Sequence, residues 1–286
     1  MKSCFDGWSP QVIDSEDKAA VIAHLEKYRF AIVTSEWEYD DTDFKKISAL
    51  YSLGEIYQSA FNRQEHKEGV STSGVNQIGG LSHGTHMVFN STSHLSLHTD
   101  GSYIPIGSIK TSILLCKQHA RQGGETVLFD SVSAFQQLQA EHPDLANILL
   151  EEQIFRRRST GTQSGKQYAH IGPVFRRDRD GGFIGGFTLD VTADWEYSRG
   201  INPRVVEAVE YLSQLAAEGS RYHLTFPLYR GQALIMRNDK ISHGRHAYTD
   251  DPAHPRTLLR GMFKPAIRNL LSSPRPERAP TCSARC

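Results

Sequence analysis

The chain has 286 residues, of which 38% are hydrophobic and 22% charged, and its 32 Lys and Arg balance 32 Asp and Glu. This composition is typical of a globular protein and excludes a largely disordered chain. Zero net charge gives no basic excess of the kind that nucleic-acid-binding proteins carry, and no apolar run approaches the ~20 residues that cross a bilayer. We therefore expect neither nucleic acid nor membrane as a partner.

Cysteine usage and the first residues bear on the compartment. The four cysteines (Cys4, Cys116, Cys282 and Cys286) include no C-x-x-C pair, and we interpret them as free thiols of a reducing environment. The first residues lack the apolar core of a signal peptide. Together these features predict a cytoplasmic protein.

The first third of the chain alternates helix and strand. A helix is predicted after a cap at Ser15, followed by a strand at Phe30–Thr34 and a second helix from about Thr42 to a stop at Gly54. Residues 69–85 are rich in Gly, Ser and Thr and show no periodicity. Long loops of this kind are usually functional, so we expect this one to close over a binding site as a lid.

From about residue 86 the pattern changes to strands, with one strong helix capped by Asn202 and ended by Gly219 and a further helix start at His142. The predicted strands are His86–Asn90, His94–His98, Ser108–Gln118, Thr126–Asp130, Gln153–Arg158, Tyr168–Arg176, Gly182–Leu189, Tyr222–Phe226, Gly231–Arg237 and Thr257–Lys264. Many strands with few outer helices favour a β-sandwich or double-stranded barrel. We predict a single domain over residues 1–264 and a C-terminal tail over 265–286.

The sequence has four His-x-Asp/Glu pairs, a spacing that metal sites use but that chance also supplies, here roughly 1.5 times. Three pairs have ordinary explanations. The pair at His24 lies within a predicted helix, the pair at His66 in a charged run, and the pair at His142 at a helix start.

The fourth pair, His98 and Asp100, ends an alternating strand. Residues two apart on a strand share a face, which suits two ligands of one ion, although a polar barrel interior is the alternative. The same alternation predicts that His94 and Ser96 also point into the barrel, beside His98.

The sequence resembles the taurine dioxygenase family of non-haem Fe(II)/2-oxoglutarate oxygenases over roughly residues 25–265. The resemblance is carried by His-Thr-Asp-Gly-Ser-Tyr at 98–103, Gly-Gly-Glu-Thr at 123–126, the strand before His-Gly-Arg at 243–245, the pair Arg256 and Arg260, and Leu-Gly-Glu-Ile at 53–56. One departure is Asn238-Asp239, where the family often has Asp-Asn. The reversal spares the metal ligands but puts the geometry of that loop in question.

The resemblance implies a fold that is mainly β with flanking helices, built on a double-stranded β-helix (jelly-roll) core. It implies Fe(II), 2-oxoglutarate and O2 as cofactor and cosubstrates. The site residues it implies are His98, Asp100 and His243 for the metal, Thr126 and Arg256 for 2-oxoglutarate, and Arg260 for substrate, to which strand alternation adds His94 and Ser96. For Arg260 the alternative is a surface ion pair, and for the distal ligand the family pattern favours His243 over His246.

These features predict an enzyme that hydroxylates an unactivated C–H bond of a small molecule, such as an amino-acid- or peptide-derived natural-product intermediate in secondary metabolism. Alternatives are desaturation or ring formation with the same cofactors, catabolism of a sulfonate, and a non-oxidative cupin-like metal-binding or sensor protein. Thr126 and Arg256 argue against the sensor, because a sensor needs no 2-oxoglutarate anchor. The substrate and the oligomeric state stay open, and a homo-oligomer is compatible with the sequence.

Overall fold

The structure is a computed structural model that describes residues 2–58, 73–80, 91–159 and 167–267. The helices of this part are α1 (Lys18–Tyr28), α2 (Asp41–Tyr51), α4 (Ser131–Glu141), α5 (Pro143–Ile148), α6 (Trp195–Ile201) and α7 (Val205–Leu215). The strands are β1 (Ile13–Asp14), β2 (Phe30–Thr34), β3 (Asn76–Gly79), β4 (Leu95–His98), β5 (Thr111–Gln118), β6 (Gln122–Gly123), β7 (Thr126–Phe129), β8 (Phe155–Arg158), β9 (Ala169–Gly172), β10 (Phe175–Arg177), β11 (Phe183–Gly185), β12 (Ala193–Asp194), β13 (His223–Phe226), β14 (Gln232–Arg237), β15 (Ser242–Arg245), β16 (Tyr248–Thr249) and β17 (Thr257–Phe263).

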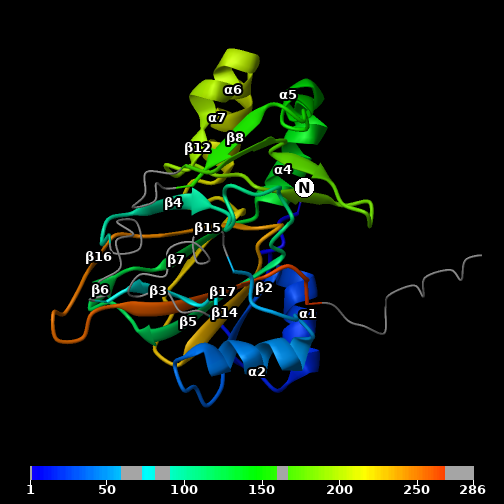
Figure 1. Cartoon of the computed structure of the whole chain (residues 1–286). Helices are drawn as coiled ribbons and strands as arrows, with labels where there is room; N and C mark the ends of the chain where they lie inside the picture. The colour runs from blue at the N-terminus through cyan, green and yellow to red at the C-terminus, as the bar shows by residue number, and fades with distance from the viewer. Residues whose placement is uncertain (1, 59–72, 81–90, 160–166, 268–286) are drawn as a thin grey trace, which may run out of the picture.

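Two sheets form the centre of the molecule (Figure 1). The larger has the strand order β1-β2-β14-β5-β17-β3, and the smaller has the order β13-β7-β15-β4. Apolar side chains from both sheets pack together, among them Leu114 of β5, Leu234 of β14 and Leu128 of β7. This cluster fills the space between the sheets, so the residues of each strand that share its face point into the interior.

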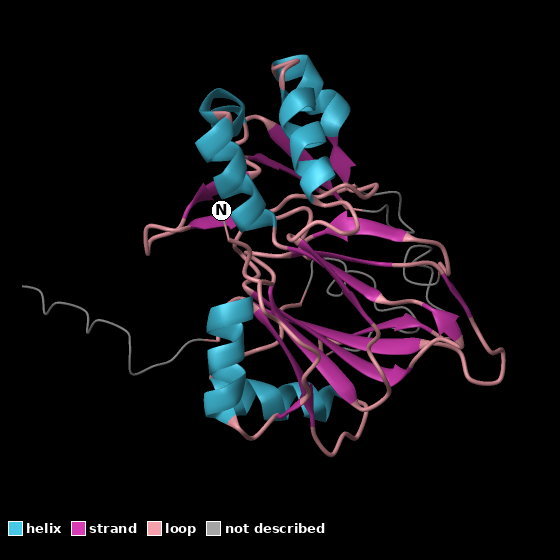
Figure 2. Ribbon diagram, turned by 180° about the vertical axis from the view of Figure 1, so that it is seen from behind, coloured by secondary structure: helices cyan, strands magenta, loops and turns pink. Residues whose placement is uncertain are grey.

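Helices cover the outer face of each sheet, which gives four layers (Figure 2). Val21 and Leu25 of α1 and Phe44 of α2 pack on the larger sheet. On the smaller sheet, Phe129 of β7 packs with Phe135 of α4 in a cluster that also includes α5 and α7. Because these strands are covered on both faces, β2, β5, β7 and β14 are buried along most of their length.

The helix ends differ in detail from the sequence prediction. The α1 cap is Asp17, whose side chain accepts from Ala20 N, and not Ser15. The second helix begins one residue earlier than predicted, because the Asp40 side chain caps it and forms a capping box with Asp43. A carboxylate accepts hydrogen bonds from free backbone N–H groups more strongly than a hydroxyl does. An Asp therefore caps the N-terminus of each of these two helices.

Two helices in the strand-rich half were not predicted. The helix α4 begins at Asp130, whose side chain accepts from Ser133 N, and α6 is a short helix capped by Asp194. The predicted strand Gly182–Leu189 is extended only over β11, and the predicted strand Tyr168–Arg176 is divided into β9 and β10.

The predicted loop 69–85 contains a strand. Residues 76–79 form β3, which pairs with β17 at the edge of the larger sheet and buries Asn76. Residues 69–72 and 81–85, the predicted strand His86–Asn90 and residues 268–286 lie outside the described residues. Ile267, which the sequence assigned to the tail, is buried against the larger sheet.

No helix in the described part of the chain has both the length and the apolar character that crossing a bilayer requires.

Candidate metal centre

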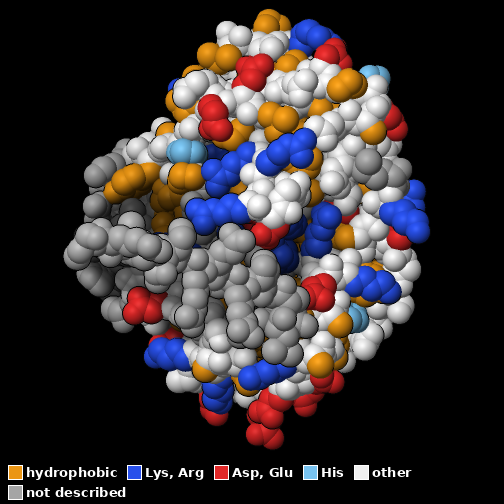
Figure 3. Space-filling model, turned by 90° about the vertical axis from the view of Figure 1, so that its right-hand side faces the viewer, with side chains coloured by type: hydrophobic (Ala, Val, Ile, Leu, Met, Phe, Trp, Pro, Cys, Tyr) orange, Lys and Arg blue, Asp and Glu red, His pale blue; other side chains and the backbone are white. Residues whose placement is uncertain are grey.

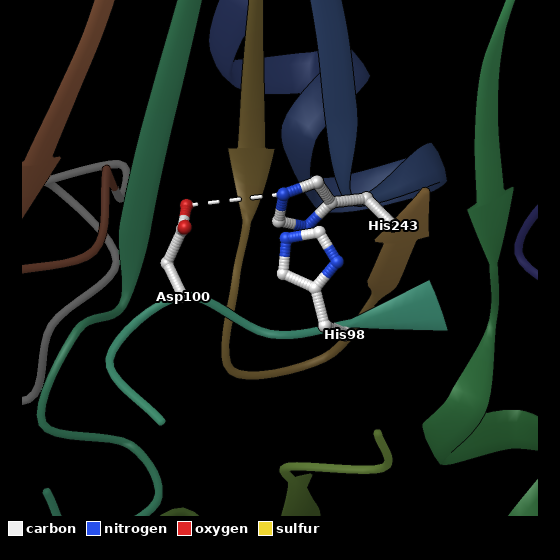
Figure 4. Close-up of side chains that lie close together, drawn as sticks. All are labelled: His98, Asp100 and His243. Atoms are coloured by element: carbon white, nitrogen blue, oxygen red, sulfur yellow. Dashed lines mark ion pairs between the residues drawn. The ribbon is translucent and has the colours of Figure 1, made fainter. Parts of the chain in front are cut away.

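His98, Asp100 and His243 meet between the two sheets (Figure 4). His98 ends β4, Asp100 follows two residues later, and His243 lies directly opposite His98 in the antiparallel pair of β15 with β4. One ligand atom from each residue lies within 4.8 Å of the others, and the imidazole centroids are 4.3 Å apart. The structure therefore brings together the two His and one carboxylate that the sequence predicted for the metal.

Both imidazoles suit metal binding. The His98 Nδ1 lies 3.0 Å from the Ser96 carbonyl oxygen, an interaction that fixes the ring and leaves Nε2 for a metal. Burial, followed by the proximity of His98, lowers the pKa of His243 to about 3. The neutral ring that results is the form in which His binds metals.

The Asp100 carboxylate is buried and held on both oxygens. Oδ1 accepts from Arg260 Nη1 at 2.6 Å, and Oδ2 accepts from the Ser112 hydroxyl at 2.7 Å. Burial opposes its ionisation, but Arg260, the two imidazoles and the Ser112 hydroxyl together hold the pKa of Asp100 well below its usual range. Asp100 is thus an anion ready to bind a cation.

Backbone contacts also fix the turn that carries Asp100. The Asn238 side chain accepts from Asp100 N at 2.8 Å and donates to the carbonyl oxygens of Asp100 and Ile109. The sequence analysis treated Asn238-Asp239 as a reversed motif of uncertain geometry. In the structure the Asn238 side chain forms hydrogen bonds with both the backbone N–H and the backbone carbonyl oxygen of Asp100.

Arg157 of β8 holds the same turn from the other side. Its guanidinium donates to the carbonyl oxygens of Gly101, Ser102 and Gly186 and to the Thr99 hydroxyl. Burial lowers the pKa of Arg157 to about 10. Nothing in the sequence identified Arg157, because a run of three arginines on a predicted strand carries no signal of burial.

The donor set fits Fe(II). Two imidazole nitrogens and one carboxylate on one face of an ion are the ligands of non-haem Fe(II) oxygenases, which keep the remaining positions open. The three residues that hold the iron would be His98, Asp100 and His243, and the nearby Arg260 lowers the electrostatic cost of the buried carboxylate.

The predicted 2-oxoglutarate residues, Thr126 and Arg256, are both buried. Thr126 of β7 pairs with Arg245 of β15, two residues from His243, and directly opposite residues share a face. Arg256 precedes β17 and is 5% exposed. A Cβ at Gly124, where φ is +77°, would lie 3.3 Å from Arg256 Nε, so the Gly-Gly pair allows the backbone to pass close to the guanidinium.

The prediction for His94 was wrong in its geometry. The register of β15 with β4 shifts between His243 and Arg245, which pair with His98 and Leu95, so β4 holds an extra residue there. A bulge reverses the alternation beyond it. His94 is exposed, and its ring centroid lies 6.3 Å from that of His246, which follows Arg245 on the outward side. The substrate roles of His94 and Ser96 stay predictions.

Comparison with known proteins identifies the family. Residues 2–262 match the family described as "Taurine catabolism dioxygenase TauD, TfdA family". A uridine-5'-phosphate dioxygenase from an Amycolatopsis species is 34% identical over 256 residues, which cover 89% of this chain and 92% of that protein. A protein of the same name from a Streptomyces species is 32% identical over 243 residues, 83% of this chain and 86% of that protein.

Solved structures share the fold. An asparagine oxygenase in complex with Fe(II), 3-hydroxyasparagine and succinate superimposes with a TM-score of 0.61 at 16% identity and covers 87% of this chain and 78% of its own. AAD-2, solved with Mn(II) and N-oxalylglycine, also gives 0.61 at 16% identity, with 89% and 90% covered. These matches confirm the predicted double-stranded β-helix. The chain belongs to the taurine catabolism dioxygenase family and is an Fe(II)- and 2-oxoglutarate-dependent dioxygenase.

Proposed function

We propose that this dioxygenase oxidises a nucleoside monophosphate of the uridine 5'-phosphate type. The observation that carries the proposal is the identity of 34% and 32%, over most of both chains, to two proteins named for that substrate. This replaces the amino-acid- or peptide-derived substrate that the sequence first suggested. A role in secondary metabolism is retained as part of the proposal.

The charge of the site supports an anionic substrate. Arg260 lies between the sheets with a side chain 12% exposed, against the carboxylate of Asp100. An iron ion adds two positive charges to the triad, so a phosphate dianion nearby would be favoured. Lys and Arg side chains also gather near the middle of one face of the molecule (Figure 3).

We assign the roles as follows. His98, Asp100 and His243 hold Fe(II), and Arg256 with the Thr126 hydroxyl binds the far carboxylate of 2-oxoglutarate, because a planar guanidinium matches a carboxylate with two parallel hydrogen bonds. Arg260 then faces the substrate side of the metal. Ser96 completes the proposed substrate residues.

When bound, the iron and 2-oxoglutarate supply the oxidising power for an unactivated C–H bond. The protein positions the substrate and excludes water. The two sheets do this by packing apolar side chains such as Leu128 and Leu258 around the interior. We propose hydroxylation as the outcome, with desaturation or ring formation as alternatives that product mass distinguishes.

The test is substrate-dependent succinate formation. Protein with Fe(II), 2-oxoglutarate and air would be incubated with uridine 5'-phosphate, uridine, cytidine 5'-phosphate, and a panel of amino acids and sulfonates. We expect uridine 5'-phosphate to raise succinate formation most and uridine to raise it little, because uridine lacks the anion. Turnover with an amino acid or a sulfonate, and none with the nucleotides, would contradict the proposal.

The same assay locates the oxidised carbon. Hydroxylation of the carbon that carries the phosphate ester gives a hemiacetal phosphate, which breaks down to an aldehyde and inorganic phosphate. Phosphate release equal to succinate formation would therefore place the attack at C5'. A product that keeps its phosphate and gains one oxygen would place it on the ribose ring or the base. Asp100→Ala is the inactive control.

A further inference from the structure

Arg245 is a buried cation beside the proposed 2-oxoglutarate site to which the sequence assigned no role. It ends β15, is 7% exposed, and pairs with Thr126 of β7. Two residues apart on one strand, His243 and Arg245 share a face, and Thr126 shares it across the ladder. The register therefore places the Arg245 side chain on the interior face, in line with the metal ligand and the Thr126 hydroxyl.

Arg245 and Arg256 contact the same aromatic ring. The Arg245 Cζ lies 4.4 Å from the Tyr248 ring centroid, and the Arg256 Cζ lies 5.1 Å from it. Both residues are less than 8% exposed. Two guanidinium groups thus contact one ring. The proximity of Arg256 is, after burial, the second cause that lowers the pKa of Arg245, to about 10.

The hydrogen bonds of Arg245 are incomplete. Nη2 donates to the carbonyl oxygens of Ser91 and Ser93, at 2.9 and 2.6 Å, which fixes the guanidinium against the segment before β4. Nη1 is buried and has no hydrogen-bond partner among the described residues. A buried charged donor without a partner is costly, so a ligand that supplies an acceptor there would be stabilised.

No carboxylate in the described part of the chain compensates the two cations. Neither Arg245 nor Arg256 has an Asp or Glu oxygen within 4.0 Å there. Asp250 acts on both guanidinium groups less than Tyr248 does, and its Oδ1 accepts from the Arg256 backbone N at 2.7 Å. The pair therefore presents positive charge, with a free Nη1 donor, that suits an anionic ligand.

We propose that Arg245 is a second cationic residue for the far carboxylate of 2-oxoglutarate, with Nη1 as its donor. This inference rests on the proposed placement of that carboxylate at Arg256 and Thr126. The Tyr248 ring contacts both guanidinium groups, and the carbonyl oxygens of residues 91 and 93 fix Arg245 so that Nη1 is left for the ligand. The far carboxylate has enough lone pairs to accept hydrogen bonds from both guanidinium groups and from the Thr126 hydroxyl.

The test compares two keto acids of equal length on Mn(II)-loaded protein, by calorimetry and without turnover. 2-Oxoglutarate has the far carboxylate, and 2-oxopentanoate has a methyl group in its place. Arg245→Lys keeps a positive charge but loses the planar guanidinium and its several N–H donors. We expect it to weaken 2-oxoglutarate binding about 10-fold or more and to change 2-oxopentanoate binding by less than about 2-fold.

Controls separate this role from a structural one. His246→Gln changes the next residue, whose side chain is 35% exposed, and should leave both affinities unchanged. Equal weakening of the two keto acids in Arg245→Lys, or unchanged 2-oxoglutarate binding, would overturn the proposal. Arg256→Lys in the same series tests the underlying placement: if it fails to weaken 2-oxoglutarate selectively, the anchor itself lies elsewhere.

A second measurement tests the proposal even if Arg245→Lys is less stable than the wild type. The rise in melting temperature that saturating 2-oxoglutarate gives the Mn(II) protein should be larger for wild type than for Arg245→Lys, while 2-oxopentanoate should raise both equally. An equal rise with 2-oxoglutarate in the two proteins would count against a contact between Arg245 and the far carboxylate.

Discussion

Arg260 Nη1 donates to Asp100 Oδ1 at 2.6 Å, and the two side chains are only 12% and 2% exposed. A residue predicted for substrate is thus paired with a metal ligand. Arg260 reaches it from the middle of β17, where it lies between Leu114 of β5 and Asn76 of β3. This geometry excludes the surface ion pair that the sequence left as the alternative for Arg260.

The first prediction follows from this pair. Arg260→Ala leaves Asp100 as a buried charge without its cation, so the free energy of unfolding of the metal-free protein should fall by about 3–5 kcal/mol. Mn(II) supplies the missing positive charge, and most of the loss should disappear when it is bound. Urea unfolding with and without Mn(II) measures both values.

Arg199→Ala is the matched control for Arg260. Arg199 forms an exposed pair with Glu196, so its loss should change stability by less than about 1 kcal/mol in either condition. If the loss of stability in Arg260→Ala is the same with and without Mn(II), then the metal does not replace the positive charge of Arg260. We also expect a lower ratio of product to succinate in Arg260→Ala, since the substrate loses a cation.

The second prediction concerns the metal itself. Asp100→Ala and His98→Ala should each abolish iron retention and turnover, because each removes a ligand that no neighbour can replace with the same geometry. Ser112→Ala removes only the hydroxyl that donates to Asp100 Oδ2, and it should keep the iron. Iron content after gel filtration measures the effect. Full iron content in Asp100→Ala would remove Asp100 from the ligand set.

The third prediction concerns the cosubstrate. Arg256→Lys keeps the charge but loses the two parallel hydrogen bonds of the guanidinium. A charge-assisted hydrogen bond contributes about 1.5–3 kcal/mol, so the KM for 2-oxoglutarate should rise roughly 10–150-fold, with a smaller change in kcat. Steady-state kinetics at saturating substrate gives both constants. An unchanged KM would show that another residue binds the far carboxylate.

The fourth prediction concerns Arg157 and the turn that carries Asp100. Arg157→Met fills similar space but removes the donor to the Thr99 hydroxyl and the Ser102 carbonyl oxygen, and one of two donors to the carbonyl oxygens of Gly101 and Gly186. The free energy of unfolding should fall by about 2–5 kcal/mol, and Mn(II) affinity should fall with it because the turn loses its fixed geometry. Urea unfolding and Mn(II) titration test the two effects. Unchanged metal affinity in a folded variant would separate this residue from the metal site.

Local sequence determined the strands and the metal motif. Strands β2, β5, β14 and β17 were predicted because each is a short apolar or β-branched run bounded by turn residues. His98 and Asp100 were recognisable because a strand places residues two apart on one face. The resemblance to a family then identified His243 from its position after β14.

The local sequence did not predict features that depend on contacts between residues far apart in the chain. The helix α4 is apolar along one side because it covers the smaller sheet, and its alternation of Ser, Val and Phe does not distinguish a helix from a strand. The bulge in β4 is another case: it reverses the face of His94, and only the register against β15 reveals it. Gly244 permits the close approach there, since a Cβ on it would lie 2.6 Å from Leu95 O.

The sequence by itself predicted the fold class, the metal ligands and the cofactors, because strand spacing pointed to His98 and Asp100 and the resemblance to a family supplied His243 and the cofactors. Only the tertiary structure showed what each arginine contacts. Arg157, Arg245 and Arg260 look alike in sequence, yet one holds a turn, one flanks Tyr248 and one pairs with Asp100. A charged side chain takes its role from the partner that replaces its lost hydration, and those partners lie 160 residues away for Arg260 and 56 for Arg157.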